Sequence, residues 1–432
     1  MRGLQAPPLG RQCRVRCPHP ALNLPIPRQM PSSHPLKVLV VHCAYQYRGG
    51  EDMVVEAEIA MLREFGHDVR LYERHNDDAS GMSVLPLALQ TIWSSRTTRE
   101  LKALCEGWRP DVIHVHNTLL LVSPSVFWVA SFMGIPVVQT LHNFRMACLN
   151  ATLLREGKVC EDCLGKAPVM GVLRGCYRES KAQSAVLASA IMVHRAMGTF
   201  QHKVSRFIAM TEFSRKKLIE AGLPSDKVCV KPNFAPDPPQ SNHAGERKGG
   251  LFVGRLSTEK GITQLLQTDA MLDPERHPIQ VVGTGPLEAE VREQFGSRYL
   301  GFADLNTIMG LMQSAQFLLM PSVCFEGALP RTALEAFCCG LPVIASRMGS
   351  MADSIVDGET GLLFEPGNAR ALADKIRWAV DHPEQMATMG RKARQTFETR
   401  YNKSSNHDML MAIYRDVIND QNLRATGGRG LK

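Results

Sequence analysis

The chain has 432 residues, a length that predicts two domains, each with a full hydrophobic core. Its hydrophobic content of 44% is ordinary for a globular protein. No apolar run approaches the roughly 18 residues that a transmembrane helix needs, so we expect no membrane-spanning segment.

The net charge of +8 is concentrated at the N-terminal end. Residues 1–36 hold five arginines and no acidic residue, and they are rich in proline. Such a segment cannot bury a core, so we expect residues 1–35 to be a disordered extension. It lacks the long apolar run of a secretory signal, and we interpret residues 1–29 as an over-extended translation start before Met30. The rest of the chain is nearly balanced in charge, and we expect no nucleic-acid partner.

The twelve cysteines do not fit the disulfide framework of a small secreted protein, because the chain is too long. Most of them stand singly in the sequence, as Cys43, Cys105, Cys229 and Cys324 do. That distribution is typical of buried thiols in a reducing compartment. We therefore expect a cytoplasmic protein.

The first half begins with a βαβ unit. Lys37–Cys43 is an unbroken apolar run that predicts a buried parallel strand, and a helix is expected over about 51–65. Between them, Gly49 and Gly50 let the backbone approach a ligand closely at the end of the strand. The loop lacks the G-x-G-x-x-G pattern, which argues against a nicotinamide or flavin cofactor.

Two further strands of this half end in polar residues. The strand over residues 110–117 carries His114 and His116 on one face, and we expect His114 to cap it through backbone hydrogen bonds. The strand over residues 136–143 is followed at once by His142 and Asn143. Open α/β sheets place their ligands at this position, so His142 is a candidate site residue.

Four cysteines follow, with one C-x2-C pair flanked almost symmetrically by two others: Cys148, Cys160, Cys163 and Cys176. The spacing suits a tetrahedral zinc site, and the segment is too poor in apolar residues to pack well alone. A cluster of free thiols is the equal alternative.

Residues 184–200 are apolar at helical spacing and end in a basic stretch. They predict either a core helix or a surface for an anionic or lipid-bearing acceptor, and the sequence does not separate the two.

A proline-rich segment at residues 231–240 marks the domain boundary, after which a βαβ pattern restarts. The run Leu251–Val253 ends at Gly254, and Ser257 or Thr258 is expected to cap the following helix. A strand ending in glycine before a helix N-terminus is a natural seat for a phosphate group. Arg255 and Lys260 flank that seat with two cationic side chains.

Two more segments that follow strands should converge on this phosphate seat. One carries Gly283 and Gly285, and the other is the loop that begins at Glu326. Together with Glu335 on the next helix, they offer two carboxylates for ribose and sugar hydroxyls beside a cationic phosphate seat. This combination suits a nucleotide-sugar. No D-x-D motif is present, so we expect diphosphate binding without a metal ion and without a catalytic cofactor.

These motifs resemble the family-4 glycosyltransferases over about residues 36–420. The resemblance is carried by Val253–Gly261, Val282–Pro286, Glu326–Ala336 and Gly340–Ala345. It implies the GT-B fold, an α/β architecture of two Rossmann-like, doubly wound domains facing a cleft. The acceptor-side domain would span residues 36–232, with a cysteine-bearing insert at 144–180. The donor domain would span 233–400, followed by a C-terminal helix and tail at 401–432.

The resemblance also implies roles by position. Arg255 and Lys260 would hold the diphosphate and stabilise the departing nucleotide, and the backbone at Gly254, Gly283 and Gly285 would line the donor site. Glu335 would bind the ribose, and Glu326 the hydroxyls of the donor sugar. From the facing domain, Gly49 and Gly50 would approach the phosphates, and His142 would line the sugar and acceptor site.

The implied activity is retaining transfer of a hexosyl unit to a saccharide or lipid-linked acceptor. The branch resembled builds bacterial surface polysaccharides, in the cytoplasm or on the inner membrane face. In one respect the chain departs from the family: Glu326 and Glu335 stand as E-x8-E, where the family has E-x7-E, so the loop must bulge to place Glu326. A non-catalytic nucleotide-sugar-binding protein, or another GT-B enzyme such as an epimerase, is the alternative.

Overall fold

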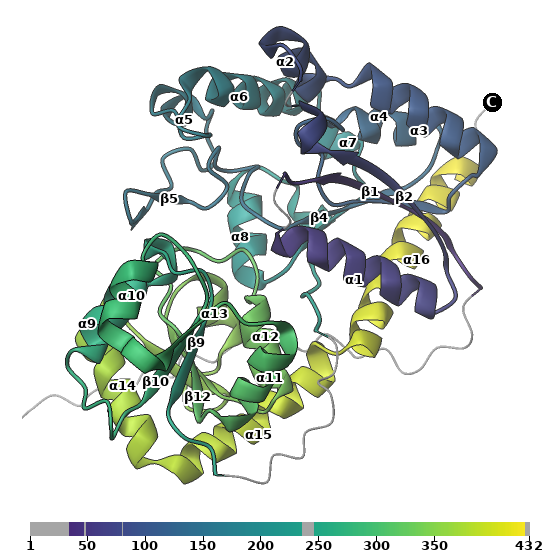
Figure 1. Ribbon diagram of the computed structural model, residues 1–432. Coiled ribbons are helices and arrows are strands. Elements are labelled where there is room, and N and C mark those ends of the chain that lie inside the picture. The colour runs from purple at the N-terminus through teal and green to yellow at the C-terminus, as the bar shows by residue number, and fades with distance from the viewer. Residues whose placement is uncertain (1–33, 47–48, 80, 236–245, 428–432) are drawn as a thin grey trace, which may run out of the picture. The chain divides into compact units, whose positions relative to one another are not determined.

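The computed structural model describes residues 34–46, 49–79, 81–235 and 246–427 (Figure 1). Of the extension expected at residues 1–35, all but the last two positions lie outside these residues. Leu36–Lys432 form one compact unit.

The N-terminal half is built on a parallel six-stranded sheet with the order β2-β1-β3-β4-β7-β8. The strands are β1 (Lys37–Ala44), β2 (Asp68–His75), β3 (Val112–Val115), β4 (Val137–Leu141), β7 (Arg206–Ala209) and β8 (Val228–Val230). Alternate residues of β1 enter two different cores, Leu39 and Val41 on one face and Val38 and Val40 on the other. Both faces are therefore covered, which explains the unbroken apolar run.

Helices supply these two covering layers (Figure 1). They are α1 (Gly50–Glu64), the 3-10 helix η1 (Asn76–Ala79), α2 (Val84–Ile92), α3 (Ser95–Gly107), α4 (Ser125–Phe132), α6 (Lys181–Ala196), α7 (Thr199–His202), α8 (Glu212–Glu220) and the 3-10 helix η2 (Ser225–Lys227). Between β4 and α6 lies the cysteine-bearing insert, with a two-stranded hairpin of β5 (Leu154–Arg155) and β6 (Lys158–Val159) and the short helix α5 (Val169–Leu173).

The C-terminal half repeats the design with the order β11-β10-β9-β12-β13-β14, again parallel. Its strands are β9 (Gly250–Val253), β10 (Ile279–Val282), β11 (Tyr299–Gly301), β12 (Phe317–Met320), β13 (Val343–Ser346) and β14 (Gly361–Phe364). Its helices are η3 (Thr258–Lys260), α9 (Ile262–Asp269), α10 (Glu288–Phe295), η4 (Gly296–Arg298), α11 (Leu305–Ser314), α12 (Arg331–Cys338), α13 (Gly349–Ser354), α14 (Ala369–Asp381) and α15 (Pro383–Arg400). Two cores again lie on opposite faces of the sheet. The predicted α/β fold with two doubly wound parallel sheets is confirmed.

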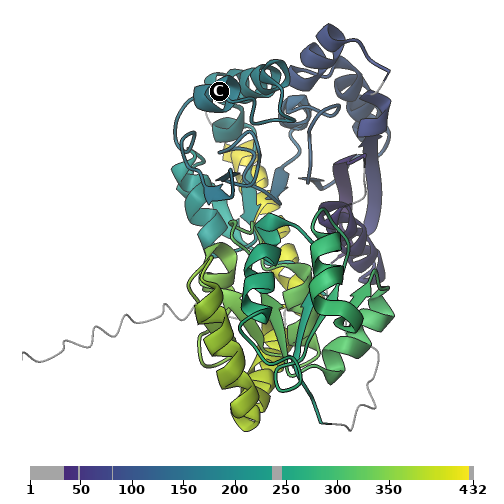
Figure 2. The ribbon, with the colours of Figure 1, turned by 60° about the vertical axis from the view of Figure 1, so that its left-hand side comes forward.

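The last helix, α16 (Lys403–Gly427), returns to the N-terminal sheet after the C-terminal half is complete (yellow in Figures 1 and 2). Its residues Leu410, Met411 and Tyr414 are buried in the same core as Val38 and Val40 of β1. The helix adds a second covalent connection between the halves, besides the segment that joins β8 to β9.

Candidate active site

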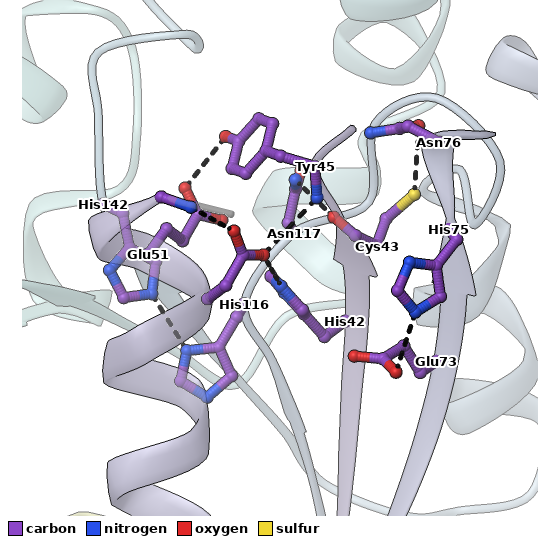
Figure 3. Close-up of polar contacts among 12 residues, drawn as sticks. His42, Cys43, Tyr45, Glu51, Glu73, His75, Asn76, His116, Asn117 and His142 are labelled. Atoms are coloured by element: carbon purple, nitrogen blue, oxygen red, sulfur yellow. Dashed lines mark hydrogen bonds and ion pairs between the residues drawn. The ribbon is translucent and has the colours of Figure 1, made fainter. Parts of the chain in front are cut away.

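Polar side chains gather where β1, β3 and β4 end, as parallel strands predict. His116 Nδ1 lies 2.9 Å from His142 Nε2, and their rings stack with centroids 5.2 Å apart (Figure 3). Burial lowers the pKa of His116 to about 4 and holds the pKa of His142 well below its ordinary value. Both imidazoles are therefore neutral near pH 7.

Behind this pair lies a buried ionic network. Glu58 of α1 faces Lys231 Nζ at 3.1 Å through one carboxylate oxygen, and His114 and His116 at 2.9 and 3.3 Å through the other. Burial alone would raise the pKa of Glu58, but Lys231 and His114 outweigh it and hold that pKa well below its ordinary value. The Glu58 carboxylate lies on the Nε2 side of the His116 ring, and the Nδ1 side contacts His142.

His114 does not act as predicted. It is fully buried, and its ring contacts the Tyr414 hydroxyl at 2.7 Å and Thr140 Oγ1 at 2.8 Å, rather than capping its strand through the backbone. The prediction failed because Tyr414 lies on α16, 300 residues further along the chain. His114 does have a structural role, as expected, but its partner is Tyr414 of α16, a helix that packs against the sheet.

The first turn of α1 places a second polar group at the same sheet edge. Gly49 is the N-cap residue, and its amide donates to Asp52 Oδ2 at 2.8 Å, while Asp52 Oδ1 also contacts His42 Nε2 at 2.8 Å. No atom lies within 4 Å of a Cβ built on Gly50. The space beside Gly50 is open, and the ligand approach expected at Gly49 and Gly50 stays a prediction.

Glu51 was missed by the sequence reasoning, although it lies among these polar groups. Its carboxylate accepts from the Tyr45 hydroxyl at 2.9 Å and from Asn143 Nδ2 at 3.5 Å (Figure 3). Burial raises its pKa to about 7, against the lowering effects of Tyr45 and Arg145. A carboxylate directly after Gly49-Gly50 was the available signal, since the first helical turn points at the strand ends.

These groups border a cavity of about 80 Å³. Its polar lining includes Glu51, His116, His142, Asn143 and Arg145. The opposite wall is apolar and comes from α6 and α7, through Leu187, Ala190, Ile191 and Phe200. Residues 184–200 therefore fall in two helices separated at Gly198. Their inner face belongs to the hydrophobic core, and some of its side chains also line the cavity.

In the C-terminal half, the glycine-bearing loops pack directly on one another. A Cβ on Gly283, which has φ +136°, would lie 1.9 Å from the carbonyl oxygen of Gly254, and one on Gly285 would lie 2.5 Å from the carbonyl oxygen of Leu256. Only glycine allows these backbones so close. The ends of β9 and β10 converge as predicted. These glycines allow the two loops to pack closely against each other.

The helix after β9 starts differently from the prediction. Neither Ser257 nor Thr258 caps α9. Ser257 Oγ donates instead to Glu259 Oε1 at 2.6 Å, and a single 3-10 turn precedes Gly261, whose φ of +79° starts α9. A Cβ on Gly261 would lie 1.9 Å from the carbonyl oxygen of Pro321, so close loop packing sets this start.

Lys260 and Glu326 meet at this edge. Lys260 Nζ donates to Glu326 Oε1 at 2.6 Å, and Ser322 Oγ donates to the same oxygen at 3.1 Å. Burial alone would lower the pKa of Lys260, but the Glu326 carboxylate outweighs it and the pKa is raised. Arg255 is exposed, and its side chain has no polar partner among the described residues.

The loop after Glu326, in which the E-x8-E spacing places one residue more than the family pattern, is anchored through two of its carbonyl groups. Ser350 Oγ donates to the Glu326 carbonyl, and Ser214 Oγ of α8 donates to the Gly327 carbonyl. A Cβ on Gly327 would lie 2.9 Å from the His142 carbonyl oxygen, so this loop reaches the strand end that carries His142. The bulge therefore leaves Glu326 beside Lys260.

Glu335 lies on α12 and is nearly inaccessible to solvent. Arg331, one turn earlier, donates from Nε to Glu335 Oε1 at 2.8 Å. Burial raises the pKa of Glu335, and Arg331 partly offsets that rise. Glu335 therefore lies on a helix, as expected, and its contact with the ribose stays a prediction.

The four cysteines of the insert come together around one small cavity. In the described structure, no three of their sulfur atoms lie within 4.8 Å of one another. The described group that does meet this separation is Glu58, His114 and His116. The Glu58 carboxylate of that group is already balanced by the Lys231 ammonium, so its charge does not require a metal ion.

The chain folds into two parallel α/β sheets. Glycine-bearing loops and the Lys260–Glu326 pair lie at the strand ends of the second sheet, and the His116–His142 pair lies at the strand ends of the first. This architecture is that of a GT-B protein. The N-terminal half matches the glycosyl transferase 4-like domain over residues 49–233, and the C-terminal half matches the glycosyl transferases group 1 over residues 233–396. The chain belongs to these family-4 glycosyltransferases.

Relatives and solved structures agree with this assignment. The D-rhamnosyltransferase WbpZ of Pseudomonas aeruginosa is 31% identical over 48% of this chain, and the match spans just over half (56%) of that relative. Anabaena HepE, solved in complex with UDP-glucose, has a TM-score of 0.59 at 16% identity, covering 88% of this chain and 99% of that one. A lipopolysaccharide outer core galactosyltransferase, WaaB, has a TM-score of 0.61 at 16% identity, covering 88% and 100%. These two likenesses show the shared fold.

Within the part of the chain that the structure describes, no helix has the combined length and apolar character to cross a bilayer.

Proposed function

We propose that the protein transfers a hexosyl unit from a nucleotide-diphosphate sugar to a saccharide or lipid-linked saccharide, with retention of anomeric configuration, in surface polysaccharide synthesis. The observation that carries the proposal is the Lys260–Glu326 contact at the glycine-lined edge of the second sheet. It places a cation for the diphosphate and a carboxylate for the sugar within one small volume.

In this proposal, the cationic donor-site residues bind the diphosphate and the carboxylates bind hydroxyl groups. When the bond between the anomeric carbon and the diphosphate breaks, negative charge develops on the leaving phosphate. Lys260 and the exposed Arg255 stabilise that charge electrostatically, which is the kind of interaction that lowers a transition-state barrier. Glu326 orients the sugar through its hydroxyls, and Glu335 accepts from the ribose hydroxyls. The proposal needs neither a metal-held diphosphate nor a catalytic cofactor.

The acceptor occupies the cavity of the N-terminal half. Its polar wall, with His142, Asn143 and Glu51, suits a sugar hydroxyl, and its apolar wall from α6 suits the less polar face of a sugar or the start of a lipid. Glu51, with a pKa of about 7, can take the proton that the acceptor hydroxyl loses. HepE, solved with UDP-glucose, and WaaB, a lipopolysaccharide outer core galactosyltransferase, support a nucleotide-sugar donor and a surface-polysaccharide acceptor.

The acceptor-side helices also offer a surface for peripheral contact with the inner membrane face. Exposed apolar side chains occur on α2 (Leu85, Leu89), on α5 (Val169, Leu173) and on α6 (Met192, Val193). Helix α6 packs against both α2 and α5, so these side chains belong to neighbouring elements. A cytoplasmic enzyme that glycosylates a lipid-linked acceptor needs such a surface. Co-sedimentation with anionic vesicles tests it, and equal recovery with and without vesicles would contradict it.

The test of function starts with donor binding. Thermal shifts with UDP, GDP and ADP identify the base, because a bound ligand stabilises the fold by mass action. Transfer is then assayed with sugars of that nucleotide and a lipid-linked saccharide panel. Glu326→Ala should remove most of the turnover, whereas near-normal kinetics would refute its role. Binding without turnover would favour a nucleotide-sugar-binding protein, and conversion of the donor without transfer would favour an epimerase.

A further inference from the structure

The insert at residues 144–180 has little of the packing that usually holds a fold together. Its buried apolar side chains fall in two small clusters, one of Phe144, Ala147 and Leu153 with Ala221 at the end of α8, and one of Leu149 with Leu187, Ala188 and Ile191 of α6. Its regular structure is limited to the two-residue strands β5 and β6 and to one turn of helix in α5. A small apolar core is marginal without an additional cross-link.

The backbone of the insert is also unusually strained. Among the described non-glycine residues with positive φ, five lie in or beside the insert: Ala151, Leu153, Glu156, Arg178 and Glu179, with φ between 50° and 68°. Such conformations persist where the surrounding structure over-determines them. The small apolar core is a weak source of that constraint, so another source is needed.

The four cysteines of the insert supply side chains that can provide this constraint as metal ligands. Cys148 follows β4, Cys160 and Cys163 follow the β5–β6 hairpin, and Cys176 follows α5. All four are free and half-buried, and all line the same cavity of about 20 Å³. A cavity of this size holds a single water-sized body, and therefore one ion rather than an organic ligand.

The charges around the cavity complement a metal thiolate centre. Arg155 and Arg174 both line it, and Arg174 is ion-paired with Asp162. The Nε of Arg155 is buried and has no hydrogen-bond partner in the described structure. A buried N–H without an acceptor is costly, and a thiolate sulfur in this cavity would accept from it.

We propose that Cys148, Cys160, Cys163 and Cys176 bind one Zn²⁺ ion as thiolates in a tetrahedral structural site. Four thiols lose up to four protons on binding, and the resulting dianionic centre lies beside the N–H groups of Arg155 and Arg174, whose charges are shared with Glu156 and Asp162. Zinc–sulfur bonds of about 2.3 Å require the sulfurs to approach one another more closely than they do here. Rotation of the thiols about χ1 between staggered positions provides that movement.

The site cross-links the segment that forms the wall of the acceptor cavity. The insert begins directly after His142 and Asn143, and its Arg145 lines that cavity. A zinc ion joining Cys148 to the hairpin and to the end of α5 would fix the position of Arg145 and Asn143. This consequence rests on the proposed function, whereas the metal site itself does not.

The first test is the metal content of the full chain purified without chelators. We expect about one zinc per chain by elemental analysis. Cys160→Ser/Cys163→Ser should lose nearly all of it, while Cys229→Ser, at a half-buried thiol outside the insert, should keep it. Wild-type protein with four freely titratable insert thiols and no zinc would overturn the proposal, as would iron in place of zinc.

A second measurement guards against a variant that does not fold. Replacing zinc by Co²⁺ in the wild-type chain should produce the ligand-to-metal and d–d absorption bands of a tetrahedral tetrathiolate. Removal of the metal should lower Tm, and zinc but not Mg²⁺ should restore it. A cobalt spectrum of octahedral, oxygen-ligated ions would contradict the site. Neither readout depends on glycosyl transfer, so the zinc proposal can fail while the proposed function stands.

Discussion

Lys260 Nζ and Glu326 Oε1 lie 2.6 Å apart, although they are separated by 66 residues in the chain. The loop that carries Glu326 is one residue longer than in the family pattern, yet Ser350 and Ser214 anchor its carbonyls and the carboxylate still reaches the lysine. The pair keeps Lys260 charged at the edge where the diphosphate is expected. The longer loop is therefore compatible with a working donor site.

Replacing Lys260 by Ala should lower kcat by about 10²–10³, because it removes a cation that stabilises the leaving diphosphate. The KM for the donor should change less than kcat, since the contact strengthens as charge develops. Steady-state kinetics measure both. Lys248→Ala is the matched control, an exposed lysine of the same half. Equal kcat for the wild type and the Lys260 variant would contradict a role in the transition state.

Transfer should depend on the ionisation of Glu51. Burial raises the pKa of this carboxyl to about 7, so kcat/KM should increase with pH through about 7 as the base form accumulates. Glu51→Gln should lower the rate by about 10²–10⁴ and remove that limb of the profile. Glu56→Gln, an exposed glutamate of the same helix, should leave the profile intact. A pH limb that persists in the Glu51 variant would assign the proton to another group.

The protein should lose stability on mild acidification through its buried histidines. Burial lowers the pKa of His116 to about 4, and the pKa of His142, His67 and His407 is lowered as well. Each binds a proton more readily in the unfolded chain, where its pKa is about 6.5. The free energy of unfolding should therefore fall as pH drops from about 6.5 towards 4, and be fully present above that range.

Thermal unfolding between about pH 7 and pH 5 tests this prediction. His116→Gln should flatten the dependence in that window, because it removes one group that Glu58, His114 and His142 all face. A Tm that is independent of pH across the window would show that these imidazoles bind protons equally in the folded and unfolded protein, and it would contradict the prediction.

The buried Glu58–Lys231 pair should be essential for stability. Lys231→Met removes the ammonium and leaves a buried carboxylate unbalanced, which should cost about 3–5 kcal/mol of unfolding free energy. Lys231 also donates to Asn406 of α16 at 2.8 Å, so its loss loosens the helix that returns to the first sheet. Urea unfolding of Lys231→Met and of Glu58→Leu/Lys231→Met gives the comparison. The double variant should recover much of the loss, and a double variant as unstable as the single one would contradict the charge argument.

The residues of the proposed donor site could be picked out because each lies in a short motif that follows a predicted strand. Arg255 and Lys260 follow the same strand, and Glu326 and Glu335 flank one helix N-terminus. The buried strands were predictable too, since continuous apolar runs such as β1 are buried on both faces. The domain boundaries and the roles given to these residues stay predictions.

The acceptor-side network could not be predicted in the same way. His114 contacts Tyr414, and Lys231 contacts Glu58, 173 residues away, so both contacts exist only after α16 and the segment after β8 have packed. One signal was present: Glu58 interrupts the buried face of α1 between Val55 and Leu62. A carboxylate at such a position needs a buried partner, although its identity comes from the fold.

The anomeric configuration of the product is the measurement that tests the central claim most directly. Proton NMR of the saccharide formed from a nucleotide-sugar of known configuration should show the donor configuration preserved in the new linkage. The same reaction with Glu326→Ala should yield much less of that product. An inverted linkage, or nucleotide binding without any transfer across the donor and acceptor panels, would contradict the account.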